Sequence, residues 1–186
     1  MRIVAGAHRG AALSAPKDSR IRPTSDRVRE SIFNILLHGG FASPLEGARV
    51  LDLFAGTGAL GLEALSRGAS FVTFVDDHAE SRALIRRNIE SLHAMGRTKL
   101  WQRDATALGS RPRGEPFDFM FLDPPYGRAL AEPAIRSALQ GGWLNDTAVI
   151  IAELEAELAP PEIEGFVLAD ERTYGDTRVV FWIHKS

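Results

Sequence analysis

Cysteine is absent from this chain of 186 residues, and long apolar runs are absent as well. Without a thiol the chain forms no disulfide, no thiolate metal site and no cysteine nucleophile, and its five scattered histidines lack the spacing of zinc ligands. We therefore expect no metal. No apolar run approaches the ~18 residues of a membrane-spanning helix, and no charged-then-apolar leader begins the chain, so we expect a cytoplasmic protein without a membrane partner.

Repeats and low-complexity tracts are also missing, and a content of 45% hydrophobic and 25% charged residues is ordinary for a soluble globular domain. The net charge of −2 is unevenly distributed. Residues 1–29 hold seven basic and two acidic residues, a net charge of +5, and the remaining 15 basic and 22 acidic residues give −7. A basic segment of this kind suits contact with RNA phosphates, although a solvated terminus has the same composition. We expect a basic extension over residues 1–40 and one domain over 41–186.

Strand-like and helix-like segments alternate along the chain, which predicts an α/β fold. Thr24 or Ser25 is a suitable N-cap for a helix that runs to about Leu37, with its apolar face formed by Val28, Ile32, Ile35 and Leu36. A hairpin is expected around Gly6–Gly10. Strands are predicted at 49–53, 71–76, 98–102, 117–122, 147–153, 166–172 and 178–184, and helices at 59–67, 79–94 and 129–140. Right-handed crossovers make the first strands parallel, and the short turn at 174–177 makes the last two antiparallel.

A glycine-rich turn lies between the apolar run at 48–51 and the helix-like run at 60–65. It contains the spacing Gly56-x-Gly58-x-x-Gly61, and Asp76 ends the next apolar run 20 residues after Gly56. This arrangement fits the fingerprint of dinucleotide-binding proteins, so an NAD-dependent oxidoreductase is one interpretation.

Charge favours a different cofactor. The chain places Asp52 at the mouth of the turn and has no Lys or Arg between Val50 and Ser66, which is unsuitable for a pyrophosphate. S-adenosylmethionine has no phosphate but carries a cationic amine and a sulfonium. Asp76 suits the ribose of either cofactor, and Asp104 is a candidate for the adenine amine or an ordinary loop cap. The predicted cofactor-binding residues are Asp52, Phe54, Ala55, Gly56, Thr57, Gly58, Asp76, Asp104 and Ala105.

The sequence Asp123-Pro124-Pro125-Tyr126 follows the apolar run at 117–122. A ring-conjugated amine is a poor nucleophile until hydrogen-bond acceptors draw its nitrogen toward tetrahedral geometry. The Asp123 carboxylate and the Pro124 carbonyl are two such acceptors, the Pro-Pro step restrains the backbone, and Tyr126 offers a stacking surface. These four predicted catalytic residues indicate an N-methyltransferase, while a simple turn after a strand is the alternative. Asp123 is either a hydrogen-bond acceptor alone or also the base that removes the proton.

These motifs together resemble those of a known family, the RsmD-type 16S ribosomal RNA guanine-N2 methyltransferases. The resemblance covers nearly the whole chain and rests on residues 2–6, 9–10, 22–30, 33–36, 52–58, 123–126 and 174–177. It implies a Rossmann-like class I S-adenosylmethionine-dependent methyltransferase, whose seven-stranded, mostly parallel sheet ends in an antiparallel strand and is preceded by a hairpin and a helix. It also implies methyl transfer to N2 of a guanine in 16S rRNA, within the assembled or assembling small subunit, by a monomer.

The predicted RNA contacts are Arg2, Arg9 and Arg20 in the basic segment, together with Arg22 and Thr24, which by resemblance are candidate contacts of the substrate or the cofactor. The chain departs from the family pattern at Ala11-Ala12, where basic residues are common, and at Asp76-Asp77-His78, where a second acid usually follows two positions later. An amino-methyltransferase acting on DNA adenine or protein glutamine shares the Asp-Pro-Pro-Tyr chemistry and remains an alternative.

Overall fold

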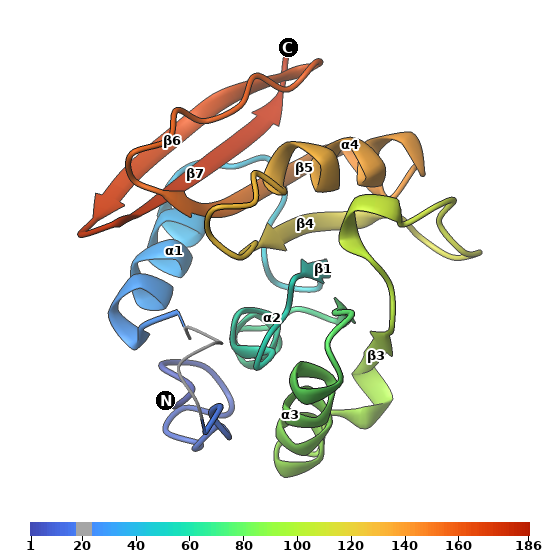
Figure 1. Cartoon of the computed structure of the whole chain (residues 1–186). Helices are drawn as coiled ribbons and strands as arrows, with labels where there is room; N and C mark the ends of the chain where they lie inside the picture. Colours follow the sequence, from blue (N-terminus) through green and yellow to red (C-terminus); the bar gives the residue numbers. More distant parts are fainter. Residues whose placement is uncertain (18–23) are drawn as a thin grey trace.

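The computed structural model describes residues 1–17 and 24–186, and the predicted RNA contacts Arg20 and Arg22 lie outside these residues. Figure 1 shows one central sheet with helices on both faces. The strands are β1 (Arg49–Leu53), β2 (Phe71–Val75), β3 (Thr98–Trp101), β4 (Phe117–Leu122), β5 (Leu144–Glu155), β6 (Phe166–Tyr174) and β7 (Thr177–His184). The helices are α1 (Asp26–His38), α2 (Ala59–Ser66), α3 (Ala79–Ser91) and α4 (Ala131–Gln140), with short 3₁₀ turns η1 (Met95–Arg97) and η2 (Ala105–Ala107).

The sheet has the strand order β3-β2-β1-β4-β5-β7-β6, so that β1 and β4 are neighbours at its centre. β3, β2, β1, β4 and β5 pair in parallel, and β7 pairs antiparallel with both β5 and β6. The predicted antiparallel last strand is thereby confirmed. The strand order reverses between β1 and β4, and ligands of doubly wound sheets bind outside the carboxyl ends of the strands at such a point.

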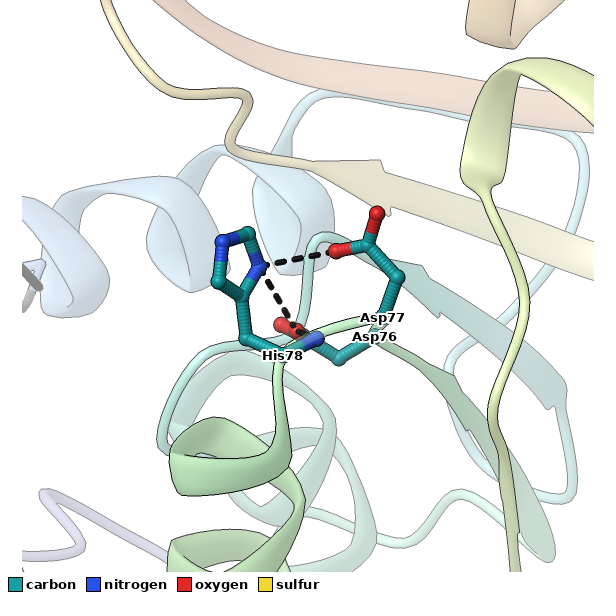
Figure 2. A group of neighbouring side chains, drawn as sticks. All are labelled: Asp76, Asp77 and His78. Atoms are coloured by element: carbon teal, nitrogen blue, oxygen red, sulfur yellow. Dashed lines mark hydrogen bonds and ion pairs between the residues drawn. The ribbon is translucent and has the colours of Figure 1, made fainter.

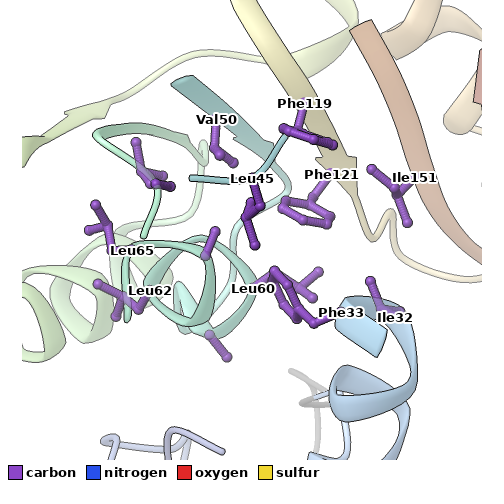
Figure 3. Close-up of a cluster of buried hydrophobic side chains, with 14 of the residues drawn as sticks. Ile32, Phe33, Leu45, Val50, Leu60, Leu62, Leu65, Phe119, Phe121 and Ile151 are labelled. Atoms are coloured by element: carbon purple, nitrogen blue, oxygen red, sulfur yellow. The ribbon is translucent and has the colours of Figure 1, made fainter. Parts of the chain in front are cut away.

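Side chains of the strands alternate between two hydrophobic clusters, one on each face of the sheet. Val50 and Phe121 belong to the cluster that α1, α2 and α3 cover, whereas Leu51 and Leu122 belong to the cluster that α4 covers. Figure 3 shows the first cluster, where Phe33 of α1 lies beside Phe121 of β4 with their ring centroids 5.6 Å apart. Because both faces are covered, the central strands are apolar almost throughout, and a polar residue within them needs a specific reason.

The helix α1 begins at its predicted cap, since the Ser25 hydroxyl accepts a hydrogen bond from the Val28 amide. Its buried face was predicted incompletely. Ile32 and Leu36 are buried as expected, but Arg29 and Phe33 are fully buried as well.

Arg29 belongs to a polar network that holds the N-terminal segment against α1 and α2. The buried carboxylate of Glu63 in α2 accepts hydrogen bonds from the Val4 and Ala5 amides and lies 3.5 Å from the Arg29 guanidinium. That guanidinium also donates to the Arg2 carbonyl. The first residues of the chain are therefore anchored to the domain through both side-chain charge and backbone.

The N-terminal hairpin is present in reduced form. Residues Arg2 and Ala12 form one antiparallel bridge, and the Ile3 amide donates to the Ala11 carbonyl at 2.9 Å. Ile3 and Leu13 are buried in the same cluster as Val50, so residues 1–40 contribute to the main core, and the boundary at residue 40 stays a prediction. In the part of the chain that is described, no helix has the length and apolar character needed to cross a membrane.

Candidate functional site

A cavity of about 1090 Å³ lies at the carboxyl ends of the central strands, where β1, β2, β5 and the loop after β4 contribute residues. Most of the residues predicted as the site line it: Thr24, Asp52, Phe54, Ala55, Gly56, Thr57, Asp76, Asp104, Ala105, Asp123, Pro124, Pro125 and Tyr126. A second, more open hollow of about 640 Å³ lies between η2 and α4, and its lining includes none of the predicted site residues. The first cavity is therefore the candidate site.

The glycine turn that follows β1 forms one wall of this cavity. Gly58 has a left-handed conformation (φ +79°) at the N-cap of α2, and a Cβ at Gly61 would lie 2.5 Å from the Phe74 ring, so glycine is required at both positions. Gly58 shapes the turn without lining the cavity. Phe54 also has a positive φ, +52°, which is unfavourable for an aromatic residue and marks local strain at the cavity wall.

Asp52 is buried beneath this turn at 1% exposure, in the central strand β1. Its carboxylate accepts a hydrogen bond from the Gly61 amide at 3.0 Å. Burial raises the pKa of Asp52 well above the usual value, the Gly61 amide opposes this rise, and repulsion from Asp76 and Glu153 adds to it. Because burial makes ionisation of Asp52 unfavourable in the free protein, a cationic ligand that pairs with this carboxylate stabilises its ionised form.

Asp76, at the end of β2, faces the turn from the other side. Its two carboxylate oxygens accept from the Gly56 amide at 2.9 Å and from the His78 amide at 2.9 Å. Burial is the largest cause of the raised pKa of Asp76, and these two amides act against it. Figure 2 shows Asp76 beside Asp77 and His78, where the His78 Nδ1 lies 2.7 Å from Asp77 and 3.7 Å from Asp76. The three side chains lie close enough together for a metal ion, and the expectation that none binds stays a prediction.

Asp104 follows β3 and lines the cavity, and it also caps η2. Its Oδ1 accepts from the Thr106 amide at 2.8 Å and the Thr106 hydroxyl at 2.7 Å, and the hydroxyl bond is the main reason that the pKa of Asp104 is lowered. Asp104 is therefore a cap, as one interpretation had it, and it also lines the cavity, whereas its contact with the adenine amine stays a prediction.

The Asp-Pro-Pro-Tyr loop after β4 forms the opposite wall. The Thr24 hydroxyl donates to Glu153 Oε1 at 2.6 Å and lies 3.5 Å from Asp123 Oδ2, so the segment that precedes α1 reaches the carboxylates of two adjacent strands. Tyr126 is tied to β7, since its hydroxyl lies 2.8 Å from the Thr177 hydroxyl, while 39% of the residue remains exposed. The loop is thus held at both ends with an accessible aromatic ring.

Glu153 is a buried acid of the cavity that the sequence analysis did not predict. It lies in β5, lines the cavity, and is 7% exposed. The signal was present: Glu153 is the first charged residue after the run Ala148–Ala152, and an acid inside an otherwise apolar central strand is rarely buried without a partner. Arg27, His78, Arg103 and Arg128 also line the cavity and were not predicted.

Arg2 and Arg9 lie elsewhere. Both are exposed residues of the N-terminal hairpin and neither lines the cavity. They are available to a large ligand that extends beyond the cavity, and not to a small molecule inside it.

A seven-stranded sheet of this order, with acidic strand ends around a glycine turn and an Asp-Pro-Pro-Tyr loop across the same cavity, is the architecture of class I methyltransferases. Comparison with known proteins agrees. The family described as Conserved hypothetical protein 95 matches residues 1–183. The chain belongs to this family, that of the RsmD-type methyltransferases.

Two relatives carry the name Ribosomal RNA small subunit methyltransferase D. The Escherichia coli K12 protein is 41% identical over 88% of this chain and 79% of its own length, and the Haemophilus influenzae protein is 34% identical over 94% and 89%. The solved structure of yhhF from Escherichia coli superposes with a TM-score of 0.83 at 33% identity, covering 100% of this chain and 98% of that one.

Proposed function

We propose that this protein transfers a methyl group from S-adenosylmethionine to the exocyclic N2 amine of a guanine in 16S rRNA of the small ribosomal subunit. The observation that carries the proposal is the placement of the Asp123–Tyr126 loop across one cavity from the glycine turn and Asp52. The names of the relatives, which are small-subunit rRNA methyltransferases, support the RNA substrate.

The residues of the glycine-turn wall fit S-adenosylmethionine. Asp52, buried and with a raised pKa, is suited to the cationic amine of the methionyl part, and Asp76 to the ribose hydroxyls. Asp104 and Ala105 line the end of the cavity where we place the adenine. When bound, this cofactor supplies an electrophilic methyl group on a sulfonium. A dinucleotide fits less well, because the turn puts a buried carboxylate where a pyrophosphate requires positive charge.

The target amine is assigned to Asp123 and Pro124. Each offers an oxygen that accepts one amine hydrogen, which localises the nitrogen lone pair for in-line attack on the methyl carbon. No covalent intermediate with the protein is required. Tyr126, fixed through its hydroxyl and exposed on its ring, supplies a surface on which the target base stacks. Asp123 accepts one hydrogen of the amine in this arrangement, and we assign it the departing proton as well.

RNA contact beyond the target base is assigned to the basic N-terminal segment, residues 1–29. Arg2 and Arg9 are exposed on a hairpin that the Glu63 network anchors to α2, so their charges have a defined position relative to the cavity. Arg20 and Arg22 belong to the same segment by sequence, and Thr24 connects it to Asp123.

The test uses small subunits from a strain that lacks this protein, purified protein and S-adenosylmethionine with a labelled methyl group. We expect label in N2-methylguanosine after nuclease digestion of the 16S rRNA, and none with Asp123→Asn within the same time. Parallel reactions with protein-free 16S rRNA and with DNA identify the substrate form. Label in N6-methyladenine of DNA, or no methyl transfer together with NAD binding, would overturn the proposal.

A further inference from the structure

Three arginines line the cavity and have no task in the mechanism above: Arg27, Arg103 and Arg128. Arg103 is already held by its neighbours. Its guanidinium carbon lies 4.1 Å from the centre of the Trp101 ring, and its Nη1 donates to the Leu108 carbonyl at 2.6 Å. These contacts fix Arg103 to the end of β3, so it forms part of the cavity wall. Arg27 and Arg128, in contrast, are both exposed.

Arg27 lies in the first turn of α1, where the helix dipole opposes a positive charge. In the described part of the chain, neither a hydrogen bond nor an ion pair offsets this charge. Arg27 therefore does not serve the stability of α1. An anion at this position would be attracted by the guanidinium and by the amides of the first turn together.

Arg128 belongs to the loop that carries the Asp-Pro-Pro-Tyr motif, two residues after Tyr126. Thr106 lowers the pKa of Asp104 through two hydrogen bonds, and Arg128 adds a smaller electrostatic contribution. Because Asp104 and Arg128 are both exposed, their interaction contributes little to stability and leaves Arg128 able to bind another anion. The cavity thus has one exposed guanidinium near Thr24 and another near Tyr126.

The target base has to leave its stack to reach this site. Asp123, the proposed acceptor of its amine, is only partly exposed, and the Thr24 hydroxyl lies 3.5 Å from its Oδ2. A base stacked within an RNA helix cannot bring its amine to such a position, and enzymes that modify base atoms extrude the nucleotide into a pocket. The phosphates on either side of the extruded nucleoside then remain at the cavity mouth, close to the exposed Tyr126 ring on which the base stacks.

These phosphates require positive charge, because most of the ionisable side chains that line the cavity are acidic, Asp52, Asp76 and Asp123 among them. A phosphodiester at the mouth is repelled by such a lining unless cations lie between them. Arginine suits this position, since its planar guanidinium binds phosphate oxygens through two parallel hydrogen bonds.

We infer that Arg27 and Arg128 bind the two phosphates that flank the extruded target guanosine. This inference rests on the proposed function. Arg2 and Arg9 do not line the cavity, so Arg27 and Arg128 form a separate set of contacts at the target nucleotide itself. Contacts there hold the base during methyl transfer, and their loss should lower kcat, whereas the loss of contacts farther away should mainly raise KM.

The experiment measures kcat/KM for methylation of small subunits at several salt concentrations, for the parent protein, Arg27→Gln and Arg128→Gln. One phosphate contact contributes about 0.7 to the slope of log affinity against log salt. We expect each substitution to reduce the slope for kcat/KM by about this amount and to lower kcat/KM about tenfold at low salt. The Kd for S-adenosylhomocysteine should be unchanged. Arg27→Lys and Arg128→Lys keep the charge and should keep the slope.

Arg86→Gln is the matched control, because Arg86 is an exposed arginine of α3 that does not line the cavity. It removes the same charge and should leave the slope and kcat/KM close to the parent values. A second arm uses subunits whose ligated 16S rRNA carries uncharged methylphosphonates on both sides of the target guanosine. The parent should lose activity on this RNA, and the variant with both Arg27→Gln and Arg128→Gln should lose no more than it has already lost.

Three results would overturn the inference: an unchanged salt slope in both glutamine variants, a methylphosphonate effect that is equally large in the double variant, or a slope that falls as much in Arg86→Gln. Weaker binding of S-adenosylhomocysteine by Arg27→Gln, with the slope unaltered, would assign Arg27 to the cofactor carboxylate and would also overturn it. In each case the parent still methylates guanine. Absence of methylation by the parent on unmodified subunits would instead refute the proposed function.

Discussion

Replacing Asp52 by Asn should weaken cofactor binding and stabilise the free protein at the same time. Asn has nearly the same shape, and its carbonyl oxygen still accepts from the Gly61 amide, so the turn should persist. What is lost is the charge. A hydrogen bond to a charged group contributes about 1.5–3 kcal/mol, so the Kd for S-adenosylhomocysteine should rise roughly 10- to 150-fold.

The effect on stability has the opposite sign. Burial raises the folded-state pKa of Asp52 above 3.8, so the folded protein binds this proton more tightly than the unfolded chain. The contribution of Asp52 to the free energy of unfolding is therefore largest below pH 3.8, and this contribution falls as the pH rises through the folded-state pKa. Asn cannot ionise, and Asp52→Asn should have a higher Tm than the parent at neutral pH.

Ligand binding reverses the pH dependence. A protonated Asp52 does not attract an ammonium group, so the affinity of the parent for S-adenosylhomocysteine should fall as pH is lowered through the pKa of Asp52. Asp52→Asn should show a weaker dependence over the same range.

Calorimetric titration at several pH values and thermal unfolding measure these quantities. Methylthioadenosine is the control ligand, because it keeps the adenosine but lacks the charged amine, and its Kd should be the same for parent and Asp52→Asn. If both ligands lose affinity equally, Asp52 acts through the shape of the turn and the charge argument is refuted. A lowered Tm would refute the burial argument.

Three further outcomes follow from the site. Asp123→Asn should bind S-adenosylmethionine nearly as well as the parent and lose on the order of a hundredfold or more in single-turnover methylation, and a near-normal rate would remove the carboxylate from the mechanism. Tyr126→Ala should weaken productive placement of the base by about 1–3 kcal/mol, because the stacking surface is lost. Tyr126→Phe keeps the ring and loses only the hydroxyl contact with Thr177 of β7, so it should retain most of the stacking energy. Both variants should bind the cofactor normally, and equal losses of turnover in the two variants would argue against stacking. Charge reversal of Arg9, Lys17 and Arg20 together should lower RNA affinity and flatten its salt dependence with cofactor affinity unchanged, and an unaltered salt slope would show a merely solvated segment.

Local patterns in the sequence determined most of the fold. The central strands are short apolar runs, α1 begins at the Ser25 cap, and α2 begins after the glycine turn. The two-residue turn between Tyr174 and Thr177 forces the last two strands into an antiparallel pair. The predicted strand β4 matches the observed one at both ends. Larger differences occur where long-range pairing sets the limits, as in β5, which extends to Leu144–Glu155 against a prediction of 147–153 because β4 and β7 both pair with it.

Much of the candidate site could also be predicted from the sequence, because its acids lie at or near the carboxyl ends of apolar runs. Asp76 and Asp123 directly follow β2 and β4, Asp52 precedes Leu53, the last residue of β1, and Asp104 follows β3 by three residues. All four line the cavity. Parallel strands bring their carboxyl ends to the same edge, so position along the chain was sufficient.

Only the tertiary structure determined which residues from distant parts of the sequence contact the site. Thr24 meets Glu153 across 129 positions of sequence, and the Tyr126 hydroxyl meets Thr177 across 51. Such contacts depend on the order and register of strands and on how α1 packs against the sheet, and no local pattern encodes them. Glu153 reaches the same cavity as Asp123 because β5 lies beside β4, with Ala152 opposite Leu122.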